Sequence, residues 1–152
     1  MLHHQSASFA SSAESGGGAD RGQGHAHTVL VVDADASGRE SLRFLLTAEG
    51  FVVAVADGVA AATRLLTEMA FEVVITDLPA AGGGSAWVHF VRSVQPAAAV
   101  VVVSADDVTG APLRSVRGEV FAWLAKPVPL EELLSVLARA TAASRDRRGP
   151  GR

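Results

Sequence analysis

Short runs of apolar residues, most of them β-branched, recur along the chain, and longer amphipathic segments separate them. The runs predict strands at residues 29–32, 52–55, 73–75, 100–103 and 120–124. They are apolar at consecutive rather than alternate positions, which is typical of strands that are covered on both faces. The alternation therefore predicts an α/β fold with one doubly wound parallel sheet of five strands, joined by right-handed crossovers.

The segments around the strands have the apolar spacing of amphipathic helices, and we expect five helices. Ser37 and Glu40 form a capping box that predicts the start of the first helix. Gly110 and Pro112 weaken the fourth, so we expect a short or broken helix within residues 106–118.

The two ends of the chain differ in composition from its middle. Residues 1–27 are rich in Ser, Gly, Ala and His and bury too little surface to offset their ordering entropy, so we expect a disordered tail. Residues 143–152 are rich in Arg and predict a flexible basic tail. One domain is expected at residues 28–142. The histidines of the first tail are expected to have no fixed geometry: His3, His4, His25 and His27.

The composition excludes several classes of function. The chain has no cysteine, which excludes disulfides, thiolate metal sites and a cysteine nucleophile. Its net charge of −3 indicates neither nucleic acid nor an anionic membrane as a partner. The sequence shows no signal peptide and no apolar stretch near the roughly 20 residues that span a bilayer. We therefore expect a cytoplasmic protein.

Polar residues follow the predicted strands where those strands end. The carboxyl ends of parallel strands meet at one edge of the sheet, and ligands of such folds bind there, where the strand order reverses. This edge is expected to bring together the carboxylates of Asp33 and Asp77, the hydroxyl group of Ser104 and the ammonium group of Lys126. Lys126 is the only lysine in the chain.

In these residues the chain resembles the receiver domains of bacterial two-component response regulators, such as the chemotaxis regulators. The resemblance covers about residues 28–140 and rests on motifs that occur in the expected order: Val-Leu-Val-Val-Asp, Val-Val-Ile-Thr-Asp, Val-Val-Val-Ser-Ala and Trp-Leu-Ala-Lys-Pro-Val. It implies a flavodoxin-like sheet with strand order 2-1-3-4-5. It also implies a signalling role in a phosphorelay, and we expect the protein not to be an enzyme.

The resemblance implies a chemical role for the polar residues. Asp77 corresponds to the aspartate that accepts a phosphoryl group from a sensor histidine kinase or a phosphotransfer protein. A carboxylate is a weak nucleophile toward phosphorus unless the charge on the phosphoryl oxygens is neutralised. Lys126 and a Mg²⁺ ion provide that neutralisation in such domains. The predicted metal ligands are Asp33, Asp77 and Pro79.

Two further residues correspond to positions that respond to phosphorylation in the family. Ser104 corresponds to a hydroxyl residue that moves toward the phosphoryl group, and Trp123 corresponds to an aromatic switch residue. The resemblance also implies a cis peptide bond before Pro127. We therefore expect the phosphoryl chemistry to rest on Asp77, Lys126 and Ser104.

Two departures from the family pattern bear on the metal. Ala34 falls on a position that normally supplies a carboxylate ligand, and a methyl group cannot bind Mg²⁺. Asp35 lies one residue further, and we expect it to face elsewhere. The segment after Asp77 is slightly shorter than usual and contains three consecutive glycines, Gly82, Gly83 and Gly84. Mg²⁺ binding is expected to be weakened or lost, in a site that has either adapted or no longer takes phosphate.

Three functions remain open at this point. The first is a single-domain receiver whose output is a contact with a downstream protein, because few residues follow the last predicted helix. The second is a phosphorylation-independent pseudo-receiver that acts as a protein-interaction module, which Ala34 favours. The third is a nucleotide- or flavin-binding enzyme. It is disfavoured because residues 33–38 form neither a glycine-rich dinucleotide turn nor a P-loop.

Overall fold

The computed structural model describes residues 26–77, 83–105 and 117–149. Its strands are β1 (Thr28–Val32), β2 (Val52–Ala56), β3 (Val73–Thr76), β4 (Ala99–Ser104) and β5 (Ala122–Ala125). Its helices are α2 (Ala36–Ala48), α3 (Val59–Glu68), α4 (Gly84–Val94), the short 3-10 helix η2 (Arg117–Glu119) and α6 (Leu130–Arg148). The first four strands lie within one residue of their predicted bounds, whereas β5 begins two residues late.

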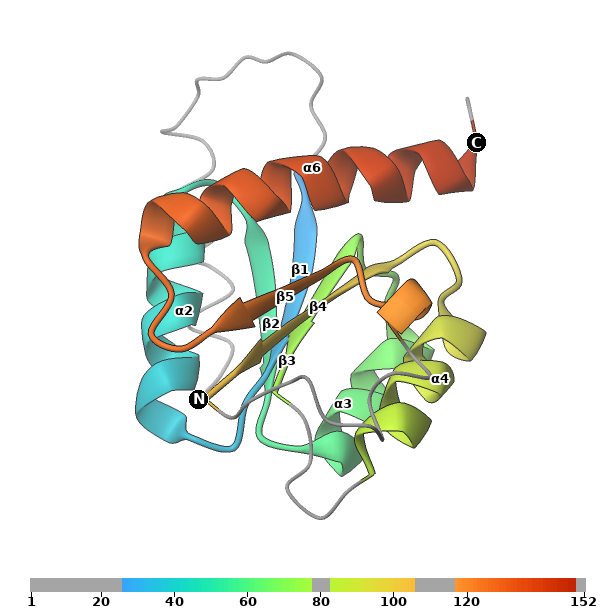
Figure 1. Ribbon diagram of the computed structural model, residues 1–152, viewed down its shortest axis with the longest axis horizontal. Coiled ribbons are helices and arrows are strands. Elements are labelled where there is room, and N and C mark those ends of the chain that lie inside the picture. The colour runs from blue at the N-terminus through green and yellow to red at the C-terminus, as the bar shows by residue number, and fades with distance from the viewer. Residues whose placement is uncertain (1–25, 78–82, 106–116, 150–152) are drawn as a thin grey trace.

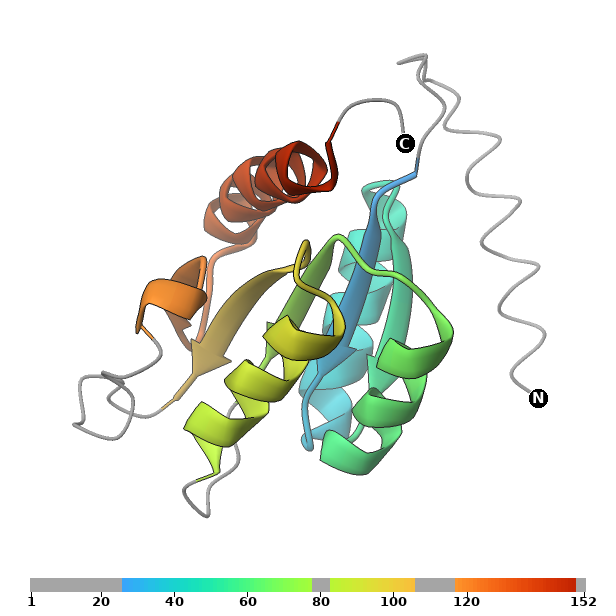
Figure 2. The same ribbon diagram turned by 90° about the vertical axis from the view of Figure 1, so that its right-hand side faces the viewer.

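The five strands form one parallel sheet in the order β2-β1-β3-β4-β5, as predicted. Helices α2 and α6 cover one face of the sheet, and α3 and α4 cover the other (Figures 1 and 2). The predicted fourth helix falls mostly on residues 106–116, which lie outside the described residues. In the described part of the chain, no helix combines the length and the apolar character needed to cross a membrane.

Each strand is apolar at consecutive positions because its two rows of side chains enter two different cores. Leu30 and Val32 of β1 belong to the core that includes residues of α3 and α4. Val29 and Val31 belong to the core that includes residues of α2 and α6. Every residue of β3 and β4 is buried. The sheet therefore forms a rigid middle layer whose edge positions any side chain that follows a strand.

The start of α2 differs from the prediction. Its N-cap is Asp35, whose carboxylate accepts a hydrogen bond of 2.8 Å from the backbone N–H of Gly38. Ser37, predicted to cap the helix together with Glu40, lies within the first turn and is exposed. The capping-box prediction was wrong because the turn after β1 is tight enough for the helix to begin two residues earlier.

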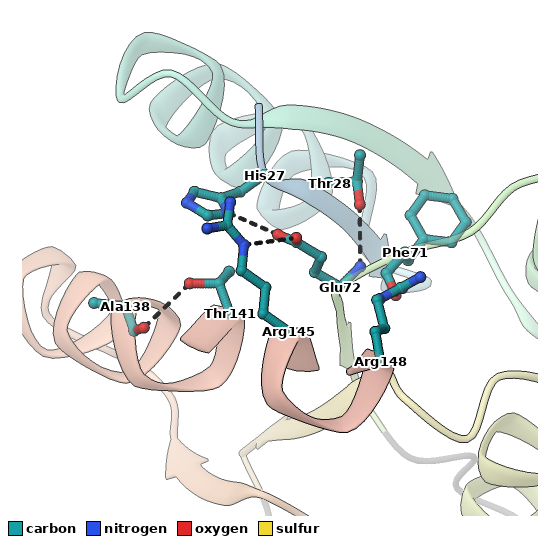
Figure 3. A network of polar contacts seen from close by, with 8 residues as sticks. All are labelled: His27, Thr28, Phe71, Glu72, Ala138, Thr141, Arg145 and Arg148. Carbon is teal, nitrogen blue, oxygen red and sulfur yellow. Dashed lines mark hydrogen bonds and ion pairs between the residues drawn. The ribbon is translucent and has the colours of Figure 1, made fainter. Parts of the chain in front are cut away.

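The basic segment at the C-terminal end is helical, and the prediction of a flexible tail at residues 143–152 is wrong as far as Arg148. Ser144 is fully buried. Arg148 donates a hydrogen bond of 3.0 Å to the carbonyl oxygen of Phe71, beside the start of β3 (Figure 3). Cationic side chains in the last turn also interact favourably with the helix dipole. The arginines that indicated a solvated tail therefore stabilise the end of a packed helix.

His27 also has a defined position, contrary to the expectation for the N-terminal tail; residues 1–25 of that predicted tail lie outside the described residues. Its Nδ1 atom lies 2.6 Å from Oε1 of Glu72, and Nε of Arg145 lies 3.4 Å from Oε2 of the same carboxylate (Figure 3). The folded unit therefore extends beyond its predicted bounds at both ends.

Candidate functional site

Three of the predicted site residues directly follow strand ends, where the sheet still holds their backbone. The N–H group of each donates to a carbonyl oxygen of a neighbouring strand over 3.0 to 3.1 Å, from Asp33 to Ala56, from Asp77 to Val32 and from Lys126 to Ser104. The ladder of the sheet thus continues one residue past each strand. This fixes the direction in which the three side chains leave the edge.

The structure brings these three side chains together. Nζ of Lys126 lies 3.1 Å from Oδ2 of Asp33 and 3.1 Å from Oδ2 of Asp77. The side chain of Asp33 is 9% exposed, whereas that of Asp77 is 35% exposed. Asp33 is thus the buried carboxylate of the pair, and Asp77 is the one that is more accessible to solvent.

The charge state of Lys126 follows from this arrangement. Partial burial acts to lower the pKa of its ammonium group, but hydrogen bonds and Coulombic attraction from Asp77 and Asp33 outweigh it. The pKa of Lys126 therefore lies above its usual value of 10.5. The site holds a permanent cation between two carboxylates at neutral pH.

The residues around Asp33 show whether the neighbouring Asp35 replaces the missing acid at position 34. Ala34 is exposed and offers no ligand. Asp35 directs its carboxylate to the N-terminus of α2, as its helix cap, while its N–H donates to Oδ1 of Asp33 over 2.9 Å. Gly38 allows this tight turn, because a Cβ atom there would lie 2.9 Å from Oδ2 of Asp35. Asp35 does not take the place of the missing ligand.

Arg39 is a neighbour of the site that the sequence analysis missed. Its guanidinium group donates to the carbonyl oxygen of Asp33 over 2.8 Å. It thereby fixes the peptide that follows Asp33 and adds positive charge near the carboxylates. Arg39 lies one helical turn after the N-cap Asp35. With the cap placed at Asp35, the sequence would have indicated that Arg39 lies near the end of β1.

The donor atoms suit a hard cation, although they are fewer than in the predicted ligand set. Mg²⁺ is commonly held by one or two carboxylates together with phosphate oxygens and water, and Asp33 and Asp77 supply two carboxylates. Pro79, the third predicted ligand, lies outside the described residues. Within the described residues no group of three or more His, Asp or Glu side chains is arranged to hold a metal ion.

The two predicted switch residues lie on neighbouring strands. Ser104 ends β4, is buried, and pairs in register with Ala125 of β5. Trp123 lies two residues before Ala125 and packs partly buried against the core shared with α3 and α4. The peptide bond before Pro127 is cis, as predicted. The structure thus places Ser104 on the same edge as Lys126, while the role of Trp123 stays a prediction.

A comparison with known protein families identifies the domain. The response regulator receiver domain matches residues 29–138, well over half of the chain. The chain belongs to this family. Receiver domains of response regulators act in two-component phosphorelay signalling, in which they interact with histidine kinases or phosphotransfer proteins and with effectors. They are generally signalling modules rather than enzymes, and they typically bind Mg²⁺ at the phosphorylation site.

Solved receiver structures have the same fold at low sequence identity. A CheY-like receiver domain protein from Methanospirillum hungatei JF-1 superposes with a TM-score of 0.73 at 18% identity, covering 81% of this chain and 99% of its own. A receiver domain protein from Clostridium thermocellum gives 0.71 at 23%, covering 78% and 97%. A response regulator from Burkholderia pseudomallei, solved with a phosphorylated aspartic acid and a calcium ion, gives 0.67 at 22%, covering 81% and 73%. A comparison with curated proteins found no match.

Proposed function

We propose that this receiver domain accepts a phosphoryl group on Asp77 and signals through contact with a downstream protein. The donor is a sensor histidine kinase or a phosphotransfer protein. The observation that carries the proposal is the ammonium group of Lys126, 3.1 Å from both Asp33 and the solvent-accessible Asp77. The protein acts as a cytoplasmic signalling module and not as an enzyme.

The chemistry that this geometry supports is an in-line phosphoryl transfer. A carboxylate oxygen of Asp77 forms a bond to phosphorus while the bond from phosphorus to the nitrogen of the donor histidine breaks, and that nitrogen keeps the electron pair. Lys126 neutralises a phosphoryl oxygen as charge gathers there. Ser104 donates its hydroxyl group to a phosphoryl oxygen afterwards, and Trp123 responds to that movement in β5.

Asp33 and Asp77 would hold the Mg²⁺ ion, and the carbonyl oxygen of Pro79 is the proposed third ligand. When bound, the ion supplies positive charge that neutralises the phosphoryl oxygens. Because Ala34 provides no ligand and Asp35 caps α2, we expect the affinity for Mg²⁺ to be weak.

The test is labelling with a small phosphodonor. The purified protein is incubated with acetyl phosphate over a series of Mg²⁺ concentrations, and intact mass spectrometry counts the phosphoryl groups added. We expect one Mg²⁺-dependent adduct in the wild type and none in Asp77→Asn, which keeps the shape of the side chain without its nucleophile. An equal adduct in Asp77→Asn would contradict the assignment of the acceptor.

The variant Ala34→Asp tests the cause of the weak metal binding. It restores an acid at an exposed position, and we expect it to lower the Mg²⁺ concentration for half-maximal labelling by about tenfold. Ala34→Asn serves as the control, because it adds a similar volume without the charge. Equal Mg²⁺ dependence in all three proteins would show that position 34 does not limit the metal.

The alternative function is a phosphorylation-independent pseudo-receiver that binds a partner protein. The observation that favours it is the use of Asp35 as a helix cap, which leaves position 34 without a substitute acid. No adduct in the wild type at high Mg²⁺, together with labelling of Ala34→Asp, would favour this alternative.

A further inference from the structure

A chain of two hydrogen bonds, the first buried and the second partly buried, ends on the backbone of Asp77. The indole Nε1–H of Trp87, in α4, donates to Oγ1 of Thr76 over 3.0 Å. The hydroxyl group of Thr76 donates in turn to the carbonyl oxygen of Asp77 over 2.6 Å. Thr76 is fully buried and Trp87 is 4% exposed, so the first contact is shielded from solvent, whereas the second is partly buried.

The direction of the second hydrogen bond depends on the first. A hydroxyl group has one proton, and its oxygen accepts through its lone pairs. Because the indole N–H only donates, it points at a lone pair of Thr76 and leaves the hydroxyl proton for Asp77. Trp87 therefore favours donation from the Thr76 hydroxyl group to Asp77. Thr76 is buried, and an unpaired polar group is costly at such a position.

These contacts complete the anchoring of Asp77 in the sheet. Its N–H group donates to the carbonyl oxygen of Val32 in β1 over 3.1 Å. Its carbonyl oxygen accepts from Thr76. Both backbone polar groups of the residue are thus held, one by the neighbouring strand and the other through the first turns of α4. The side chain then leaves a fixed backbone in the direction of Lys126.

The same chain joins the two flanks of residues 78–82, a segment outside the described residues. Thr76 and Asp77 precede that segment, and Trp87 follows it in α4. The backbone N–H of Trp87 donates to the carbonyl oxygen of Gly83, so its position is also set by the start of the helix. Besides the apolar packing of α4 on the sheet, a buried side-chain hydrogen bond thus ties the end of β3 to the first turn of α4.

We infer that Trp87 is a positioning residue for Asp77: acting through the hydroxyl group of Thr76, it holds the Asp77 carboxylate in contact with Lys126. The inference rests on the proposed function only where it concerns the rate of phosphoryl transfer. It predicts that loss of either hydrogen bond slows the transfer, because an acceptor misplaced by a fraction of an ångström loses in-line geometry.

The first test compares initial labelling rates with acetyl phosphate at saturating Mg²⁺. Trp87→Phe removes the donor but keeps an aromatic ring, and Thr76→Val removes the hydroxyl group at similar volume. Each is expected to slow labelling about tenfold. The double variant should be no slower than either single variant, because both remove one connected unit. Thr76→Ser, which keeps the hydroxyl group, is expected to retain the wild-type rate.

A matched control separates positioning from general loosening of α4. Val91→Ala opens a cavity one turn further along the same helix at a fully buried position, without touching the hydrogen-bonded chain. It should lower stability yet label at the wild-type rate at a temperature where every variant is folded. Equal slowing by Val91→Ala and Trp87→Phe would overturn the inference.

A second readout needs no phosphorylation. Lys126 is the only lysine, so the lysine Cε signal in a carbon–proton NMR spectrum comes from this residue alone. At one fixed pH, we expect Trp87→Phe and Thr76→Val to shift this peak toward its position in Asp77→Asn, and Val91→Ala to leave it unmoved. An unmoved peak in both chain variants would overturn the inference even if the wild type is labelled. A shifted peak without any labelling would leave the positioning role standing and refute only the proposed function.

Discussion

At the scale of single residues, the charge balance of the site depends on Lys126. Its ammonium group separates two carboxylates that would otherwise repel each other. The chain contains no tyrosine, no cysteine and no second lysine. No other side chain therefore changes its charge between about pH 9 and pH 12. An alkaline titration of stability therefore reports on the two ion contacts of Lys126 alone.

The stabilising contribution of Lys126 should disappear in alkaline solution. Because folding raises the pKa of Lys126 above 10.5, both states hold the proton below that pH, and above it the unfolded chain releases its proton first. The free energy of unfolding should fall from there until the pH passes the folded pKa. We expect a loss of about 1 kcal/mol or less, since the side chain is partly exposed. Urea unfolding between about pH 8 and pH 12 measures it.

Lys126→Met is the control for this titration, because it keeps the length of the side chain without its charge. The difference in unfolding free energy between the wild type and Lys126→Met should be constant below about pH 10 and should shrink above it. A difference that stays constant throughout would show that the two 3.1 Å contacts do not stabilise the fold.

The sheet edge could be predicted from the sequence because it depends on local information. Asp33, Asp77 and Lys126 each follow an apolar run directly, and parallel pairing alone brings such positions together. The contact between Trp87 and Thr76 could not be predicted in the same way. Helical spacing indicates which face of α4 packs inward, but not which polar atom the indole meets across the core.

At the scale of elements, the start of α2 shows a limit of motif reading. The sequence motif predicts the cap at Ser37, because Glu40 completes a capping box with it, whereas the structure uses Asp35, which is also of a residue type that caps helices. The choice between them depends on how tightly the chain turns after β1. That turn is set by the hydrogen bond from Asp35 to the carboxylate of Asp33, a property of the folded edge.

Removal of the observed cap should destabilise the protein, whereas removal of the predicted cap should not. We expect Asp35→Ala to lower the free energy of unfolding by about 1 kcal/mol, because the N–H of Gly38 loses its acceptor. Ser37→Ala should change it by less than about 0.5 kcal/mol, since Ser37 is exposed inside the helix. Urea unfolding of the two variants measures this difference. An equal loss of unfolding free energy in both would show that Ser37 contributes to the cap as much as Asp35 does.

At the scale of the whole molecule, the carboxyl and amino ends of the strands carry different groups of polar residues. The carboxyl edge carries the proposed acceptor site. At the opposite edge, Glu72 joins His27, just before β1, to Arg145 near the end of α6, so that one carboxylate links residues 118 positions apart (Figure 3). Such separations lie beyond any periodicity in the sequence. This explains why both boundaries of the domain were predicted too far inward.

The contacts of Glu72 should make a measurable contribution to the free energy of unfolding. Glu72→Gln removes the charge from a largely buried carboxylate that contacts two partners, and we expect a loss of about 1–2 kcal/mol in unfolding free energy. Glu40→Gln is the matched control: it makes the same change in an exposed pair with Arg43, and it should cost less than about 0.5 kcal/mol.

Hydrogen exchange then shows which parts of the protein are destabilised by Glu72→Gln. If Glu72 joins the two ends, Glu72→Gln should speed exchange together in the first residues of β1 and in the last turn of α6, while amides beside Asp77 keep their protection. Faster exchange at only one of the two ends would show that Glu72 stabilises that element alone. Uniformly faster exchange would mean that the two edges of the sheet open as one unit, and that a change at this edge also reaches the proposed acceptor site.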